Sequence, residues 1–123
     1  MYDHVGLNVK DYPASRAFYE AALAPLGYKP VMEFEEWKAV GFGSVDKPEF
    51  WVAEREPYGT GTHVAFACAD RATVDAFYAA AVAAGGTDNG PPGLREHYHP
   101  TYYAAFVHDL DGNNVEAVCH APE

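Results

Sequence analysis

The sequence HVGLNVKDYPASRAFYEAALAPLG at residues 4–27 has a second copy, HVAFACADRATVDAFYAAAVAAGG, at residues 63–86. The matched positions lie 59 residues apart throughout, without a gap. They include His4 with His63, Val5 with Val64, Asp11 with Asp70, Phe18 with Phe77, Tyr19 with Tyr78 and Gly27 with Gly86. A repeat of fixed period indicates one supersecondary unit that was duplicated, because a unit that cannot bury its apolar face alone packs on a neighbouring copy.

Each copy predicts a strand followed by a helix. Residues 4–9 alternate between large apolar and other side chains, which is the period of a strand with two different faces. Asp11 and Asp70 are suitable helix N-caps, and glycines end both helical patterns. Three short apolar segments separated by turn residues then follow, near 29–34, 37–43 and 48–54 in the first copy and near 87–90, 102–108 and 114–120 in the second. The unit is therefore predicted to be βαβββ, present twice.

The length and composition fit one domain over residues 1–123. A chain of 123 residues that is 49% hydrophobic can bury a single core shared by both copies. We expect module one to span about residues 1–58 and module two about residues 59–123, with no independent folding of either.

The net charge, the cysteines and the N-terminal sequence argue against several classes of function. A formal net charge of −10 argues against nucleic acid and anionic membranes, which both need a basic surface. Two cysteines far apart, without a CxxC motif, argue against a disulfide framework or a structural zinc site. We find no signal-peptide pattern and no apolar stretch that approaches the roughly 20 residues of a membrane span, so we expect a cytoplasmic protein.

Two histidines and one glutamate are the candidate metal ligands. His4 and His63 begin the first strand of each copy, on the face opposite the large apolar residues. The same alternation near the C-terminus places Glu116 on that face. Two imidazoles and one carboxylate around a common cavity can hold a divalent metal with open coordination positions. Taken singly, each residue could be an ordinary structural or solvated strand residue; the equivalent positions of the two histidines favour the metal.

These residues resemble a known family. The runs from His4 to Val9 and from Asp11 to Gly27, together with Asp109-Leu110-Asp111-Gly112-Asn113-Asn114-Val115-Glu116, are similar to the vicinal-oxygen-chelate superfamily. That superfamily includes glyoxalase I, extradiol dioxygenases, fosfomycin-resistance enzymes and bleomycin-binding proteins. The resemblance implies an α+β fold in which two βαβββ modules form a cupped, barrel-like mixed sheet with the helices outside.

The resemblance also implies a metal in the cup, bound by a His from the first strand and a Glu from the last strand of each module. His4, His63 and Glu116 match three of these positions. The fourth falls on Phe50 or Trp51, and Glu49 can supply it only if a bulge shifts the strand.

The three-ligand set bears on the activity that the resemblance implies. The four-ligand design resembles glyoxalase I, whereas two His and one carboxylate are similar to the set of extradiol dioxygenases. Those dioxygenases also have a Tyr about ten residues before the final Glu, and this chain has Phe106 there. Neither activity is matched in full.

A loop rich in aromatic residues and histidines is the second concentration of candidate chemistry. His97 and His99 are suitable acid–base groups near neutral pH. Tyr102 and Tyr103 could orient a phenolic or carbonyl substrate by hydrogen bonds. The alternative is an edge segment whose aromatic rings pack on the sheet and whose histidines are solvated.

We therefore predict a small metal-dependent enzyme, a lyase or extradiol-type dioxygenase that acts on a small oxygen-rich substrate. The cofactor is a divalent metal ion, Fe, Mn, Ni or Zn, that polarises vicinal oxygens of the substrate. The alternative is a metal-free binding or resistance protein, whose negative charge would favour cationic ligands. We expect a homodimer, and the three metal ligands can come from one chain or be shared between two.

Overall fold

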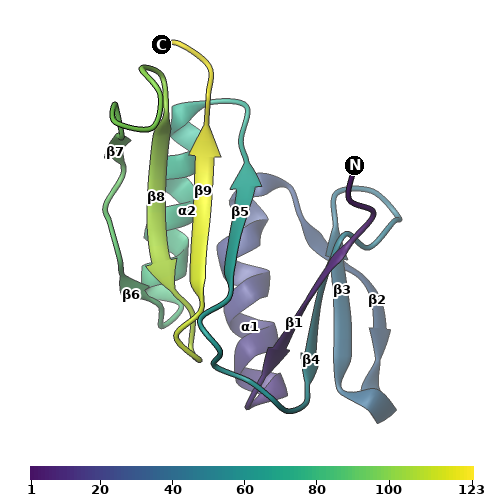
Figure 1. Cartoon of the computed structure of the whole chain (residues 1–123). Coiled ribbons are helices and arrows are strands. Elements are labelled where there is room, and N and C mark those ends of the chain that lie inside the picture. The colour runs from purple at the N-terminus through teal and green to yellow at the C-terminus, as the bar shows by residue number, and fades with distance from the viewer.

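The computed structural model describes residues 1–123, and its elements follow the predicted order (Figure 1). Module one contains β1 (Val5–Val9), α1 (Tyr12–Leu23), η1 (Ala24–Leu26), β2 (Lys29–Phe34), η2 (Glu35–Trp37), β3 (Ala39–Gly43) and β4 (Phe50–Glu54), where η is a 3-10 helix. Module two contains β5 (His63–Ala67), α2 (Arg71–Ala83), β6 (Thr87–Asp88), β7 (Gly93–Leu94), β8 (Tyr103–His108) and β9 (Asn114–Cys119). The short strands β6 and β7 together occupy the position that β2 has in module one. They are two strands instead of one because Pro91 and Pro92, which lie between them, have no N–H to continue the ladder.

Both helices begin at the predicted caps. The carboxylate of Asp11 accepts a hydrogen bond from the backbone N–H of Ala14 at 3.1 Å. Asp70 does the same for Thr73 at 2.8 Å. Each cap pairs an N–H that has no partner within the helix, so the two helices start at equivalent positions of the repeat.

The strands form two separate sheets. The order is β1-β4-β3-β2 in module one and β5-β9-β8-β6 in module two, with β7 also paired to β8. In each sheet the first and last strands of the module run parallel, as β1 with β4 and β5 with β9. The α+β class and the cup of two modules are confirmed, but the sheets do not close into a barrel. β1 and β5 remain unpaired edges that lie next to each other in Figure 1.

The helices cover one face of the sheets and build the shared core. α1 and α2 pack against each other behind the strands (Figure 1). Phe18, Phe50 and Phe77 are buried between the helices and the sheets, and Phe66 of β5 contacts Phe50 of β4 with ring centroids 5.2 Å apart. The opposite face of each sheet is free of helices and carries the candidate site.

A buried polar contact joins the two modules. The hydroxyl of Tyr19 on α1 donates a hydrogen bond to Asp109, at the β8–β9 turn. Asp109 also accepts from the backbone N–H groups of Asp111 and Asn113, at 2.9 and 2.8 Å. Because each buried polar atom here has a partner, the turn before β9 is held in one position against module one. Neither helix is long and apolar enough to cross a membrane.

Candidate metal centre and ligand cavity

The free face of module two brings two of the three predicted ligands together. His63 is the first residue of β5, and Glu116 lies on the adjacent β9, opposite Ala65. The imidazole donates from Nε2 to Oε1 of the Glu116 carboxylate at 2.8 Å. Glu116 is only 1% exposed, whereas the His63 side chain is half exposed. A buried carboxylate beside a reachable imidazole offers one oxygen and one nitrogen ligand at the same point of the sheet.

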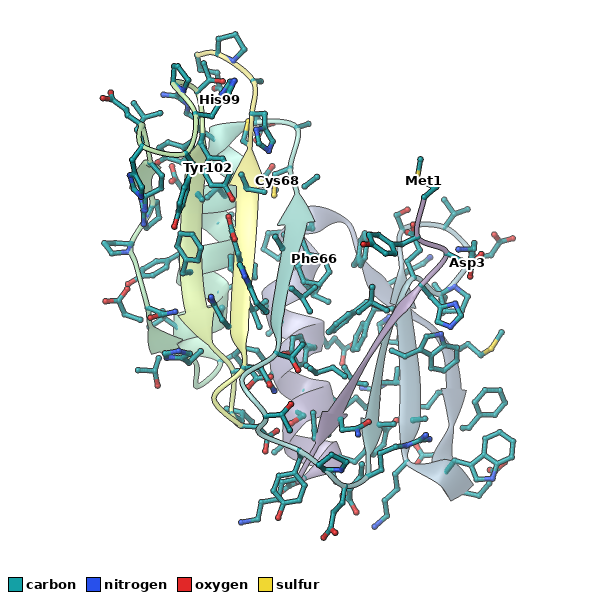
Figure 2. All side chains as sticks on the ribbon, in the orientation of Figure 1. Met1, Asp3, Phe66, Cys68, His99 and Tyr102 are labelled. Atoms are coloured by element: carbon teal, nitrogen blue, oxygen red, sulfur yellow. The ribbon has the colours of Figure 1, made fainter.

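Tyr102 completes the surroundings of the Glu116 carboxylate. Its hydroxyl donates to Oε2, the oxygen that His63 does not contact. Burial, together with the neighbouring carboxylate, raises the pKa of Tyr102 to about 12. The phenol therefore stays protonated at neutral pH and holds the carboxylate in place as a hydrogen-bond donor. Tyr102 and His99 lie at the same end of module two in Figure 2.

His4 is not part of this cluster within one chain. It precedes β1, which begins at the upper end of module one in Figure 1, whereas β5 begins with His63 at the lower end. Asp3, which accepts a hydrogen bond from His4 at 2.8 Å, lies on the far side of the molecule from Tyr102 in Figure 2. No group of three or more His, Cys, Asp or Glu side chains in the chain could hold a metal ion. A single chain thus supplies two of the three predicted ligands at one place.

The register of the strands identifies the residue that stands where module one lacks a Glu. Gly6 pairs with Trp51 in the parallel β1–β4 ladder, and Ala65 pairs with Glu116 in the β5–β9 ladder. Since Gly6 and Ala65 are equivalent in the repeat, Trp51 is the counterpart of Glu116. The β1–β4 ladder runs without a bulge. Glu49 precedes β4, and burial, followed by the nearby Glu49 carboxylate, raises the pKa of Tyr28.

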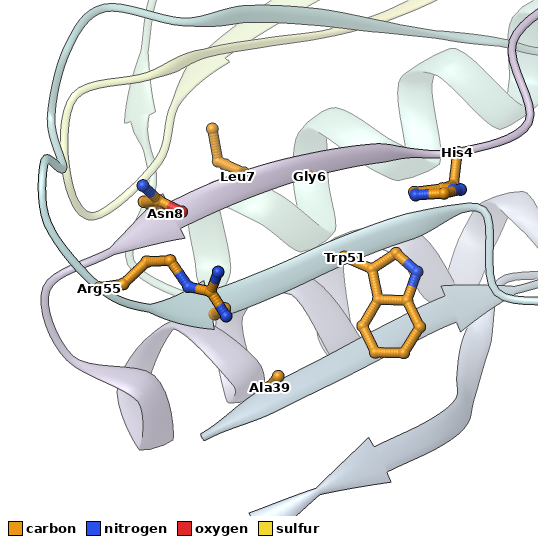
Figure 3. A pocket seen from close by; sticks show the side chains of 8 residues that line it. His4, Gly6, Leu7, Asn8, Ala39, Trp51 and Arg55 are labelled. Carbon is orange, nitrogen blue, oxygen red and sulfur yellow. The ribbon is translucent and has the colours of Figure 1, made fainter. Parts of the chain in front are cut away.

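A cavity of about 310 Å³ lies on the free face of module one (Figure 3). Its walls include His4, Gly6, Asn8, Trp51, Ala53 and Arg55. A second cavity, also of about 310 Å³, lies on the free face of module two and includes Arg95, His97, Tyr98 and Phe106. Phe106 pairs with Glu116 across the β8–β9 ladder, and its ring centroid is 6.4 Å from that of His63. Each module therefore contributes one hollow beside its candidate ligands.

The comparison with known families agrees with this geometry. The model of the Glyoxalase/Bleomycin resistance protein/Dioxygenase superfamily matches residues 2–117, which is nearly the whole chain. The chain belongs to this superfamily. None of the curated proteins matches the sequence.

Solved structures of the superfamily are similar over the full chain. A glyoxalase/bleomycin resistance protein from Albidiferax ferrireducens T118 is 32% identical, with a TM-score of 0.82 and 99% of each chain covered. A glyoxalase I mutant from Zea mays is 25% identical with a TM-score of 0.69, and the match covers 95% of this chain and 46% of that one. A family enzyme from Burkholderia phytofirmans PsJN, 21% identical with a TM-score of 0.70 over 97% of this chain and 98% of that one, shows the fold alone.

The remaining candidate catalytic residues separate into different places. His97 stacks beside Tyr98, with ring centroids 4.2 Å apart, and lines the cavity of module two. His99 accepts from Thr101 through Nδ1 at the end of the loop. Tyr103 does not lie with them: its hydroxyl donates to Asp75 of α2 at 2.6 Å, so it faces the helix. Tyr102 and Tyr103 are consecutive in the sequence, and successive side chains of an extended segment point to opposite faces.

Sequence reasoning missed Arg55. Trp51, Ala53 and Arg55 alternate along β4 and just beyond it, which places all three on the free face with His4. The sequence shows the alternation but not where β4 ends. A single arginine near a turn is common, so nothing in the sequence singles out Arg55. In this member of the superfamily, Arg55 is the one fixed positive charge on the cavity wall of module one.

Proposed function

We propose that the chain is a metal-dependent enzyme of the glyoxalase/dioxygenase superfamily that acts on a small oxygen-rich substrate, as a lyase or an extradiol-type dioxygenase. One observation carries the proposal: the 2.8 Å contact between His63 Nε2 and the buried Glu116 carboxylate on the helix-free face. Burying a carboxylate is costly unless it is paired, and a divalent cation bound by both the carboxylate and the imidazole would supply such a pairing charge. Superfamily members typically use a divalent metal.

The residues present fit part of a metal centre. Imidazole nitrogen and carboxylate oxygen are ligands that Fe, Mn, Ni and Zn accept. When bound, the metal would act as a Lewis acid toward oxygen atoms of the substrate. Tyr102, which donates to the second carboxylate oxygen, orients Glu116 for this role. His97, on the wall of the adjacent cavity, is the candidate acid–base group.

We further propose that His4 completes the centre from a second copy of the chain, in a homodimer. Two observations support this assembly. The two halves of the ligand set lie on helix-free faces of different modules, and β1 and β5 are both unpaired sheet edges. A symmetric pair of chains that places module one of one copy against module two of the other would join His4 to His63 and Glu116 twice. Trp51 at the fourth position favours a three-ligand set.

Metal content tests the enzyme proposal directly. Untagged protein is incubated anaerobically with Fe(II), Mn(II), Ni(II) or Zn(II), desalted and measured by mass spectrometry. We expect stoichiometric metal in the wild type, loss of metal in His63→Ala, and retention in His120→Ala, which removes an exposed histidine just after β9. Retention of metal in His63→Ala would refute the proposed ligand set.

A second function is favoured by a different observation. The cavity beside Trp51 has the volume of a small-molecule site and needs no metal to exist. A metal-free binding or resistance protein would use this cavity to sequester its ligand. In that case Trp51→Ala would weaken ligand binding and His63→Ala would not, whereas the enzyme proposal expects His63→Ala to abolish turnover.

A further inference from the structure

We propose that the cavity on the free face of module one binds a planar organic carboxylate, with the conjugated body of the ligand against Trp51 and its carboxylate on the guanidinium of Arg55. A planar carboxylate is then the substrate class of the proposed enzyme. That the cavity is a substrate site rests on the proposed function. Binding itself requires only residues of module one.

The floor of the cavity suits a flat ligand. Gly6 on β1, Ala39 on β3 and Ala53 on β4 bring only small side chains to the surface, and a Cβ added at Gly6 would meet nothing within 4 Å. The indole of Trp51 rises beside this floor (Figure 3). Its indole lies across Gly41, where an added Cβ would come within 3.0 Å of the ring. The glycine thus lets the indole lie flat, and a flat indole offers a stacking face.

The charge of the cavity wall is opposite to that of the chain. None of the residues that line the cavity is acidic, although the formal net charge is −10. Arg16, Lys38 and Lys47 each form an ion pair with a carboxylate. Arg55 forms neither an ion pair nor a side-chain hydrogen bond, and its guanidinium extends over the floor in Figure 3. Local charge, not net charge, decides what a cavity attracts at contact distance, because exposed charges further away are screened.

The guanidinium of Arg55 matches a carboxylate in shape. A guanidinium offers two parallel N–H donors to a carboxylate and stacks on flat conjugated groups. Asn8, next to Arg55 in Figure 3, is fixed by a hydrogen bond from Nδ2 to the carbonyl of Pro57 at 2.9 Å, which leaves its Oδ1 as an acceptor. His4 is at the other end of the cavity. A ligand anchored at Arg55 therefore directs its far end toward the proposed metal ligand.

Calorimetric titration of metal-free protein with 2-naphthoate, and with the neutral 2-naphthamide, tests the inference. We expect the naphthoate to bind and the amide to bind at least tenfold more weakly. Arg55→Gln should lower the affinity for naphthoate roughly tenfold or more, with Arg55→Lys in between, because lysine keeps the charge and loses the paired donors. Trp51→Leu should lower the affinity for both probes. Circular dichroism checks that each variant is folded.

The matched control is Arg95→Gln on module two. Arg95 is held by the carbonyls of Gly93 and Pro91, at 2.9 and 2.8 Å, and lies over the ring of Phe106. We expect this variant to bind naphthoate like the wild type. Absence of naphthoate binding, equal binding of the amide, or a loss in Arg95→Gln instead of Arg55→Gln would each overturn the inference. Because the protein is free of metal, these outcomes do not depend on the metal titration that tests the proposed function.

Discussion

Removal of the Tyr102 hydroxyl tests the organisation of the candidate metal centre. In Tyr102→Phe the Glu116 carboxylate, 1% exposed, keeps its contact with His63 and loses the donor to Oε2. A hydrogen bond to a charged group contributes about 1.5–3 kcal/mol to the free energy of unfolding. Removing the donor from the buried carboxylate oxygen should lower the stability by that amount. At about 2.1 cal/mol/K of unfolding entropy per residue, a 123-residue chain shifts its Tm by roughly 4 °C per kcal/mol. We therefore expect a Tm lower by about 6–12 °C for the metal-free variant.

Urea and thermal unfolding of the metal-free proteins measure this difference, with Tyr98→Phe as the matched control. Tyr98 packs on Tyr102, with ring centroids 5.1 Å apart, but is exposed and its hydroxyl has no hydrogen bond within the chain. We expect the control to stay within about 0.5 kcal/mol of the wild type. If Tyr102→Phe also stays within that range, the hydroxyl does not hold Glu116 and our reasoning about this centre fails.

Three further predictions concern pH, packing and thiol reactivity. The pKa of Tyr102 is raised from 10.0 to about 12 in the folded protein, so the stability that its hydroxyl contributes is complete below pH 10 and is lost as the pH rises from 10 toward 12. The unfolding free energies of the wild type and Tyr102→Phe should therefore converge over that pH range. Gly86→Ala should cost about 1–3 kcal/mol in urea unfolding, because a Cβ there would come within 2.5 Å of Val107 Cγ1, and an unchanged midpoint would contradict this packing. Burial raises the pKa of Cys68 to about 11, so alkylation by iodoacetamide at pH 8.5 should be roughly a hundredfold slower than for a free thiol, and a rate equal to that of glutathione would show an open site.

The fold could be predicted because its information is local and repeated. Asp11 and Asp70 cap helices at equivalent positions, and the alternation of residues 4–9 identifies a strand with two faces. The sequence could not predict that the two sheets stay separate instead of closing into a barrel. Closure depends on how β1 and β5 meet, and neither edge strand carries a sequence signal for its partner. The split of one edge strand into β6 and β7 depends on Pro91 and Pro92, which in the sequence are equally typical of a turn between two elements.

The candidate site was predictable in its parts and not in its assembly. Alternation placed His63 and Glu116 on one face correctly, because they lie on strands that are neighbours in the same sheet. His4 follows the same rule, but its distance from the pair depends on the arrangement of the two modules. Tyr102 and Tyr103 show the limit of alternation: both were candidates, and only the contacts with Glu116 and with α2 tell them apart.

The most direct test of the central claim is metal binding by a mixture of two variants. His4→Ala and His63→Ala are each expected to bind no metal as homodimers. If His4 of one chain completes the centre of the other, unfolding and refolding them together yields heterodimers with one intact centre, and about a quarter of the wild-type metal content per chain returns at random pairing. No return of metal, although wild-type protein taken through the same procedure binds it fully, would contradict a centre shared between two chains.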